Sequence, residues 1–370
     1  MLFKNINNFI FYLVIFCIIL LFPLCYILKK IKRLRELKNE TINSSIGEPY
    51  LMEESISPYN VQLTNDIPNG NGGLSYLKIN TNDLNLKLIH DTYENDLGMI
   101  LPKDTQIIFG AGTTMMVGAL YYALQKKLQE PIYVKTNSDV FYLLHKKITY
   151  PAKNVEWIDK NSQANLAVIV SPSNPLGIVT NPHEVREQYQ LYDVVYDKSF
   201  FTGKNKSINE NIYEEFKTND KIYITSSFSK LGLAGARFGY LLTRDPEIAK
   251  YCKEYVNINS VRYPTAGATI SRIAYYRYFC KKSWKDNIYN IITKRREFFY
   301  NNAERHGIKI YSKNNLVPYI YTDKSVKWWL EKFNVNTRKG SDFNDTDDNS
   351  RFNLMLTTEY WDEFERRFSK

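Results

Sequence analysis

Cysteine is scarce in this sequence of 370 residues: there are four, and none stands in a CxxC pair or a spacing typical of a disulfide framework. This excludes a secreted domain held together by disulfides and indicates a reduced chain that faces the cytosol. The sequence also lacks zinc-ligand spacing, a helix-turn-helix pattern and the aromatic motif of RNA-recognition domains. A nucleic-acid-binding function would therefore rest only on the formal net charge of +10. The hydrophobic fraction of 44% is that of a folded protein with a large core.

Charged residues are absent from Phe9 to Leu28, which consists almost wholly of Phe, Ile, Leu, Val, Tyr and Cys. Twenty helical residues at about 1.5 Å each span roughly 30 Å, the thickness of the hydrocarbon core of a bilayer. A cleaved signal peptide is the alternative, but its apolar core is usually shorter and no small-residue cleavage site follows. Six basic residues lie between Lys29 and Lys38. The sequence therefore predicts a single-pass membrane anchor whose C-terminal body faces the cytosol, with the basic cluster at anionic headgroups.

The rest of the chain is predicted to form an α/β domain followed by a smaller α+β domain. We expect a polar linker over residues 38–58, and after it strands and helices alternate. The predicted strands of a sheet of about seven are 106–109, 131–135, 155–158, 166–170, 194–197, 221–226 and 238–242. From residue 266 helices predominate, with short strands near 308–311, 317–321 and 352–356. The predicted divisions are an anchor (1–28), a basic segment and linker (29–75), a large domain (76–265) and a C-terminal domain (266–370).

The segment from Ser226 to Tyr240 carries the most specific chemistry. It reads Ser-Ser-Phe-Ser-Lys-Leu-Gly-Leu-Ala-Gly-Ala-Arg-Phe-Gly-Tyr and places Lys230 just after a predicted strand. A lysine held in a cleft at a strand end has a lowered pKa, so its amine can form an imine with an aldehyde. Arg237, which leads into the next strand, can bind a phosphate with two parallel hydrogen bonds. A solvated loop lysine and a structural arginine are the plainer alternative.

This motif resembles the cofactor-lysine motif of fold-type I pyridoxal-phosphate (PLP) enzymes, the aminotransferase superfamily. Within it, the chain is most similar to the branch of alliinases and plant tryptophan aminotransferases, from about His90 to the C-terminus. The resemblance implies the PLP-dependent transferase fold, with a mixed, mostly parallel seven-stranded sheet, and a homodimer. It also implies that Lys230 forms an aldimine with PLP and that Ser227 and Arg237 contact the cofactor.

Further motifs follow in the order of that family. Backbone N–H groups at a helix N-terminus bind phosphate, and the turn Gly110-Ala-Gly-Thr-Thr precedes a predicted helix. The resemblance makes this turn the phosphate cup, and it assigns the other contacts as follows: Gly112, Thr113 and Thr114 to the phosphate, Asn174 to the phenolic oxygen of the cofactor, Asp197 to the pyridinium nitrogen, and Arg351 to the α-carboxylate of the substrate. A buried Asp needs a partner, and a protonated ring nitrogen is a suitable one.

The sequence departs from the family pattern at two places. Relatives carry Tyr three residues after the ring-binding Asp, whereas Phe200 stands three residues after Asp197. Loss of that hydroxyl is expected to raise the pKa of the imine and slow some steps. The usual Pro-Tyr pair of the ring-stacking region is also missing, which leaves Phe141 or Tyr142 for that role.

The expected function is transamination of an L-amino acid to a 2-oxo acid, with an aromatic amino acid as a candidate substrate. Two alternatives stay open at this point: an alliinase-like C–S lyase acting on S-substituted cysteine, and a catalytically degenerate membrane protein on the same fold. No metal is expected.

Overall fold

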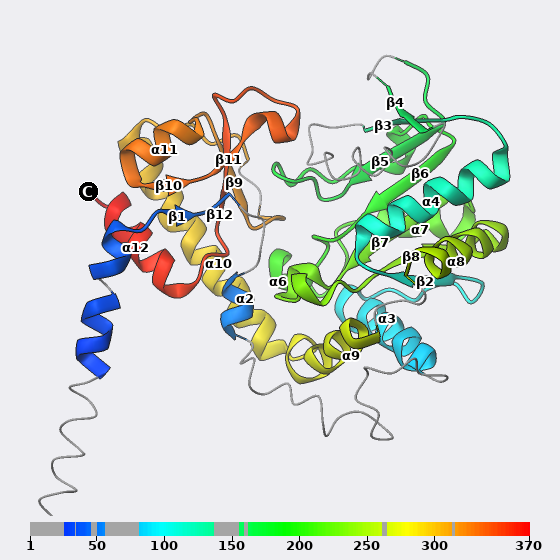
Figure 1. The fold of residues 1–370 in the computed structure, drawn as a ribbon, viewed down its shortest axis with the longest axis horizontal. Coiled ribbons are helices and arrows are strands. Elements are labelled where there is room, and N and C mark those ends of the chain that lie inside the picture. The colour runs from blue at the N-terminus through cyan, green and yellow to red at the C-terminus, as the bar shows by residue number, and fades with distance from the viewer. Residues whose placement is uncertain are drawn as a thin grey trace, which may run out of the picture.

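The computed structural model describes residues 26–33, 35–45, 50–55, 81–136, 155–158, 162–260, 265–312 and 315–370. Two lobes are visible (Figure 1): a larger one built around a seven-stranded sheet, and a smaller one that contains the C-terminus. The long helix α10 (Lys282–Ala303) runs from the boundary between the lobes into the smaller one.

The sheet of the larger lobe has the strand order β2-β8-β7-β6-β5-β3-β4. Strand β8 is antiparallel to both of its neighbours, and the remaining pairs are parallel. This confirms the predicted mixed, mostly parallel sheet. The strands are β2 (Gln106–Gly110), β3 (Ile132–Lys135), β4 (Val155–Trp157), β5 (Leu166–Val170), β6 (Tyr189–Asp193), β7 (Ile222–Ser227) and β8 (Gly239–Thr243).

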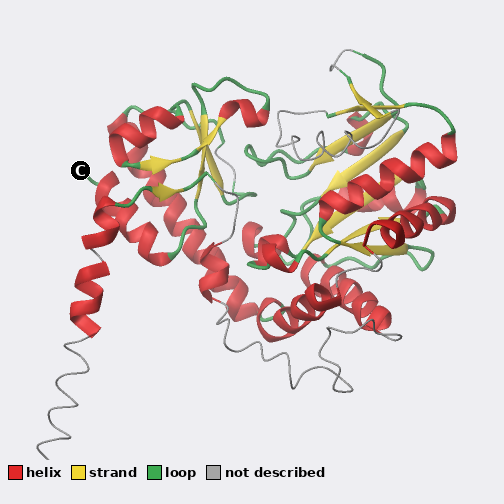
Figure 2. Cartoon of the chain, in the orientation of Figure 1, coloured by secondary structure: helices red, strands yellow, loops and turns green. Residues whose placement is uncertain are grey.

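Helices cover both faces of this sheet, as Figure 2 shows. Helices α4 (Thr113–Leu128) and α8 (Pro246–Ser260) pack on one face, where Leu191 of β6 and Tyr223 of β7 join their apolar cluster. Helices α3 (Thr81–Leu97) and α7 (Glu210–Thr218) pack on the other face, against Tyr192 and Ile224. Because successive side chains of a strand alternate between faces, odd-numbered residues of β6 and β7 lie on the α4 face.

The smaller lobe packs aromatic side chains between α10, a three-stranded sheet and two helices. The sheet has the order β11-β12-β9, and its central strand β12 (Ser350–Asn353) is antiparallel to both β11 (Arg338–Lys339) and β9 (Tyr319–Thr322). Helices α11 (Val326–Phe333) and α12 (Thr358–Phe368) complete the lobe. Five side chains form its centre: Phe299, Trp329, Phe352, Phe364 and Phe368.

Helices α9 (Thr265–Ala274) and α2 (Tyr50–Ser55) lie near the boundary between the lobes in Figure 1. A short π-helix (Tyr275–Phe279) continues α9 and has a buried tyrosine and phenylalanine at its two ends. Two non-helical residues, 280 and 281, then separate the π-helix from α10.

Three expectations from sequence are corrected by the structure. The region 38–58 is not purely linker, because Ile42–Asn43 forms strand β1, which pairs in parallel with β10 (Val335–Asn336), and residues 50–55 form α2. The strand expected at 194–197 lies earlier, at 189–193. Residues 308–311 form only an isolated bridge, Ile310 to Thr322, and not a strand.

The predicted membrane span covers residues 9–28. Residues 9–25 lie outside the described residues, and only the last three positions of the span belong to a described helix. Within the described part of the chain, no helix is both long enough and apolar enough to cross a bilayer.

Candidate active site

The phosphate cup predicted from the sequence is brought together across three strands. Gly239, at the start of β8, pairs with Gly110 on one side and with Ser227 on the other. The turn after β2 and the end of β7 therefore flank the start of β8 on its two sides, and α4 begins directly after that turn at Thr113. A Cβ atom at Gly239 would come within 2.7 Å of the backbone of Gly112, so the turn and the strand touch closely.

Arg237 reaches the same turn. Its Nη2 donates to the carbonyl oxygen of Ala111 at 3.2 Å, and a Cβ atom added at Gly112 would lie 2.8 Å from that Nη2. Gly112 has φ +83°, a conformation that L side chains rarely adopt, and as the N-cap of α4 it provides no side-chain acceptor. The first turn of α4 contains no acidic residue. An anion therefore fits here, between the positive end of a helix and a guanidinium group.

Lys230 lies in a short 3-10 turn, Ser229–Leu231, three residues after β7 ends at Ser227. Its side chain is half-buried, and its Nζ lies 5.6 Å from the centre of the Tyr196 ring. Tyr196 is buried, and burial raises the pKa of its phenol well above the usual value. A tyrosine hydroxyl can both donate and accept a hydrogen bond.

Asn174 joins Tyr196 to Arg351. The side-chain Nδ2 of Asn174 donates to the Tyr196 hydroxyl at 3.1 Å, and its Oδ1 accepts from Nη1 of Arg351 at 3.1 Å. The Arg351 guanidinium lies 4.2 Å from the centre of the Tyr319 ring, and the hydroxyls of Tyr196 and Tyr319 are 3.0 Å apart. The structure thus brings Asn174, Arg351 and the Lys230 neighbour Tyr196 into one contiguous cluster.

Arg351 is suited to holding a carboxylate. It is buried at 3% exposure, its Nη2 donates to a backbone carbonyl, and its Nε has no acceptor among the described residues. Burial lowers the pKa of the guanidinium, although arginine stays charged under physiological conditions. A carboxylate ligand would satisfy the buried donor and compensate the buried charge.

Asp197 occupies a different place from the one expected of a ring-binding carboxylate. Its carboxylate accepts hydrogen bonds from the Ser207 hydroxyl, from the Asn209 side chain at 3.0 Å and from the Ile208 N–H at 3.2 Å. These partners precede α7, the helix on the face of the sheet opposite α4. Burial raises the pKa of Asp197, while the bonds from Ser207 and Asn209 oppose that rise. This carboxylate is engaged by its own surroundings.

Asp193, four residues earlier, is a second candidate for the ring-binding carboxylate. Asp193 is the last residue of β6, is buried, and lies between Val170 of β5 and Thr225 of β7. Asp193 is an odd-numbered residue of β6, so its side chain lies on the α4 face of the sheet. The side chain of Ser227, at the end of β7, lies on the same face. Tyr196 follows it by three residues, which is the Asp-to-Tyr spacing that is missing between Asp197 and Phe200.

Asp193 and Tyr196 are thus candidate site residues that sequence reasoning missed, although the spacing Asp-Val-Val-Tyr was there to find them. Phe200 lies instead in an aromatic cluster with Phe201 and Trp284, at ring-centre distances of 4.6 and 5.5 Å. The candidate stacking residues, Phe141 and Tyr142, lie outside the described residues.

Comparisons with known proteins identify the family and the fold. The profile of the family described as aminotransferase class I and II matches residues 39–368. The chain therefore belongs to the class I and II aminotransferase family, whose cofactor is pyridoxal phosphate. The predicted superfamily is confirmed.

Among curated relatives, the chain is 25% identical over 174 residues to an aspartate aminotransferase of Sulfurisphaera tokodaii, covering 43% of this chain and 41% of that protein. It is 21% identical over 193 residues to alliin lyase 1 of Allium sativum, covering 48% and 37%. The chain thus aligns with about two fifths of the length of these relatives.

Solved structures show the same fold. An aromatic aminotransferase from Pyrococcus horikoshii superposes with a TM-score of 0.68 at 16% identity, covering 89% of this chain and 94% of that one. An aspartate aminotransferase from Thermus thermophilus, solved with maleate, superposes with a TM-score of 0.68 at 14% identity, covering 93% and 95%. At these identities the likeness concerns the fold.

Proposed function

We propose that this protein is a PLP-dependent aminotransferase that converts an L-amino acid to its 2-oxo acid. The observation that carries the proposal is the cluster of Lys230, Tyr196, Asn174 and Arg351, which puts an amine, two hydrogen-bonding groups and a carboxylate-binding guanidinium side by side. The glycine turn at the start of α4 and Arg237 supply a matching anion site.

The residues present fit the cofactor. Thr113, Thr114, Ser227 and Arg237 would hold its phosphate, Asn174 and Tyr196 its phenolic oxygen, and Asp193 its ring nitrogen. When bound, PLP supplies an aldehyde that takes up the amino group of a substrate and a ring that withdraws electrons from the substrate α-carbon.

The side chains of this protein would divide the remaining work. Asp193 keeps a proton on the ring nitrogen, because a buried carboxylate favours a cationic partner. Arg351 holds the substrate carboxylate with parallel hydrogen bonds, which fixes the direction of the α-carbon. The Lys230 amine moves the α-proton as a general base and acid.

Reduction with borohydride tests the central assignment. Full-length protein loaded with PLP is reduced, digested and mapped by mass spectrometry, and we expect the cofactor on Lys230. The matched variant Lys230→Arg keeps the positive charge but cannot form the covalent bond, so it should show no adduct at position 230. An adduct at another lysine, or none in the wild type, would refute the proposal.

A C–S lyase is the second candidate, because three alliin lyases of Allium are among the matching relatives. Incubation with L-phenylalanine, L-tryptophan or S-methyl cysteine in the presence of a 2-oxo acid separates the two activities. Transfer of the amino group to the oxo acid identifies an aminotransferase, whereas ammonia and pyruvate released from S-methyl cysteine identify a lyase. A degenerate protein would do neither. Phe200 and the altered ring-stacking region favoured that alternative, and the hydroxyl of Tyr196, three residues after Asp193, argues against it.

The proposal includes a membrane anchor and a cytosolic catalytic body. It is supported by the uncharged run from Phe9 to Leu28 and by the helical residues 26–33, which expose Ile27 (50%) and Leu28 (56%) among lysines. The full-length chain should stay in the membrane pellet after alkaline carbonate washing. The acceptor sites Asn39-Glu-Thr and Asn43-Ser-Ser should stay unglycosylated, because glycosylation would place the body on the lumenal side.

The proposal also includes that the protein forms a homodimer. Support comes only from the family, in which active sites border the partner subunit. Light scattering of the detergent-solubilised protein should give twice the mass of one chain, 43.5 kDa, after subtraction of the detergent. A monomer that retains activity would contradict it.

A further inference from the structure

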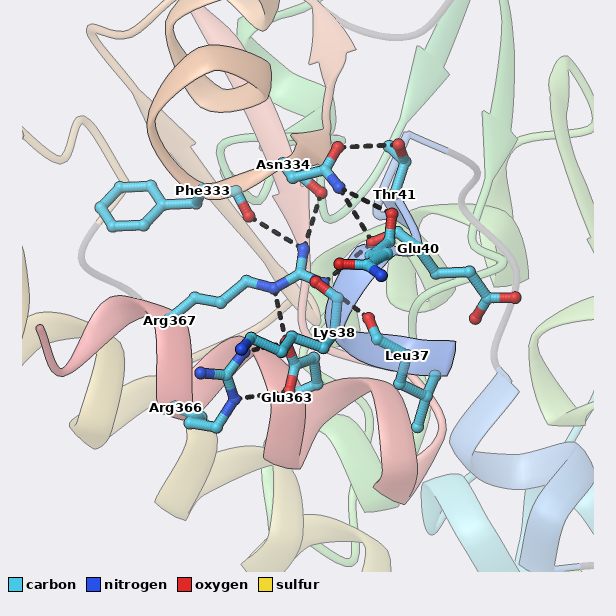
Figure 3. A network of polar contacts seen from close by, with 10 residues as sticks. Leu37, Lys38, Glu40, Thr41, Phe333, Asn334, Glu363, Arg366 and Arg367 are labelled. Atoms are coloured by element: carbon cyan, nitrogen blue, oxygen red, sulfur yellow. Dashed lines mark hydrogen bonds and ion pairs between the residues drawn. The ribbon is translucent and has the colours of Figure 1, made fainter. Parts of the chain in front are cut away.

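One arginine fastens the N-terminal segment to the smaller lobe. Arg367 on α12 donates to carbonyl oxygens of two separate stretches of chain, at distances between 2.8 and 3.2 Å, and to the carboxylate of Glu363 at 2.8 Å (Figure 3). The carbonyls belong to Leu37, Lys38, Glu40, Phe333 and Asn334.

These carbonyls lie at the C-terminal ends of two helices, residues 35–39 and α11. The last carbonyls of a helix have no partner within it, and a positive charge is favourable at that end. Arg367 therefore satisfies both helix ends with a single guanidinium and holds them together.

The chain continues from this joint toward the candidate active site. After β1, the N–H of Ser44 donates to the Asn336 carbonyl at 2.7 Å. The buried Ser44 hydroxyl accepts from the N–H of Asn353 at 2.6 Å, and Asn353 is the last residue of the strand that carries Arg351. The next carbonyl, that of Ser45, accepts from Nη2 of Arg351 at 2.9 Å.

The Arg351 guanidinium is thus held from two sides. Asn174 of the larger lobe binds its Nη1, and Ser45 binds its Nη2. Both bonds fix the plane of the guanidinium above the Tyr319 ring. A carboxylate is bound bidentately only when that plane has the right direction, so the N-terminal contact sets part of the binding geometry.

We propose that residues 35–45, here called the strut, are a positioning element for the substrate-binding arginine, and that Arg367 and Ser44 are its positioning residues. The inference rests on the proposed function, in which Arg351 binds the substrate carboxylate. It links the segment that follows the predicted anchor to substrate affinity rather than to the cofactor.

The test uses the full-length protein loaded with PLP and three variants: Ser44→Ala, Arg367→Lys and the control Arg366→Ala. Arg366 is adjacent to Arg367 and also binds Glu363, but the hydrogen bonds found for it among the described residues do not reach the strut. Steady-state kinetics with L-phenylalanine and calorimetry with phenylpyruvate give KM and the dissociation constant. Titration with PLP gives cofactor affinity.

For Ser44→Ala and Arg367→Lys we expect a rise of about tenfold in KM and in the dissociation constant, the size of one lost hydrogen bond. The kcat and the PLP affinity should change less than about twofold by the same reasoning, and Arg366→Ala should match the wild type. Arg367→Lys is used because it keeps the charge; Ser44→Ala tests the same point if the lysine variant does not fold.

A double-mutant cycle separates positioning from general loosening. In an Arg351→Lys background, Ser44→Ala should have no further effect on KM, because its effect passes through the guanidinium. Equal effects in both backgrounds would overturn the inference. If Arg351→Lys raises KM but neither strut variant does, the positioning role of the strut is refuted and the proposed function stands. If Arg351→Lys leaves KM unchanged, the proposed substrate site itself is overturned.

Discussion

The hydroxyl of Tyr196 accepts a hydrogen bond from the side-chain nitrogen of Asn174, at 3.1 Å. The two residues come from loops that follow neighbouring strands, β6 and β5. In a parallel sheet the carboxyl ends of strands lie at one edge, where open α/β sheets bind their ligands. The contact therefore puts side by side the two groups that are proposed to bind the phenolic oxygen of the cofactor.

The first prediction concerns this hydroxyl. Tyr196→Phe should lower kcat about tenfold, because one hydrogen bond to a charged oxygen is worth about 1.5 kcal/mol. Tyr319→Phe is the matched control: it removes the bond between the two tyrosines but leaves the Tyr196–Asn174 contact and the ring beneath Arg351. Equal losses of kcat in both variants would mean that the tyrosine pair, and not the Asn174 contact, matters.

The second prediction distinguishes the two aspartates. Asp193→Asn should lower kcat by at least about a hundredfold, because an amide cannot keep a proton on the ring nitrogen as a carboxylate does. Asp197→Asn should instead lower thermal stability, because its buried partners Ser207 and Asn209 lose a carboxylate acceptor. Kinetics and melting curves of both variants test this, and the opposite pattern would restore Asp197 as the ring partner.

The third prediction concerns the anion site. Gly112→Ala places a Cβ atom 2.8 Å from Nη2 of Arg237 at a residue with φ +83°. We expect PLP affinity to fall by more than tenfold, because the turn must shift away from the phosphate donors. Gly235→Ala is the control, since a Cβ atom there meets nothing within 4 Å. Fluorescence titration with PLP measures both, and an unchanged affinity in Gly112→Ala would place the phosphate elsewhere.

The fourth prediction concerns pH. Hydrogen bonds from Arg366 and Arg367 hold the pKa of Glu363 below its ordinary value of 4.5. A carboxyl group whose pKa is lowered on folding stabilises the fold above its unfolded pKa, and that contribution is lost as the pH falls through the folded pKa. Glu363→Gln should therefore cost about 2 kcal/mol at pH 7.

The difference in melting temperature between wild type and Glu363→Gln should then shrink as the pH falls below 4.5. Asp362→Asn is the control on the same helix, because Asp362 is exposed. A gap that stays constant down to pH 3 would show that the Glu363 carboxylate does not stabilise the fold through its charge.

The sequence by itself predicted the α/β class and a sheet of about seven strands. It also singled out Lys230, Asn174 and Arg351 as candidate site residues. It could do so because these residues stand in local motifs, where glycine, proline and apolar runs fix the backbone within a few residues. From residue 266 helices predominate as expected, and α11 (Val326–Phe333) and α12 (Thr358–Phe368) are examples.

Only the tertiary structure decided which aspartate faces the candidate cofactor site. The apolar run Val194–Tyr196 favoured a strand ending at Asp197, but β6 ends at Asp193, and its residues Gln190 and Tyr192 are less apolar than those of a typical buried strand. Which face a side chain takes depends on strand register, and register is set by the neighbouring strands β5 and β7. The contact between Ser45 and Arg351 joins residues 306 positions apart, which a local pattern in the sequence does not encode.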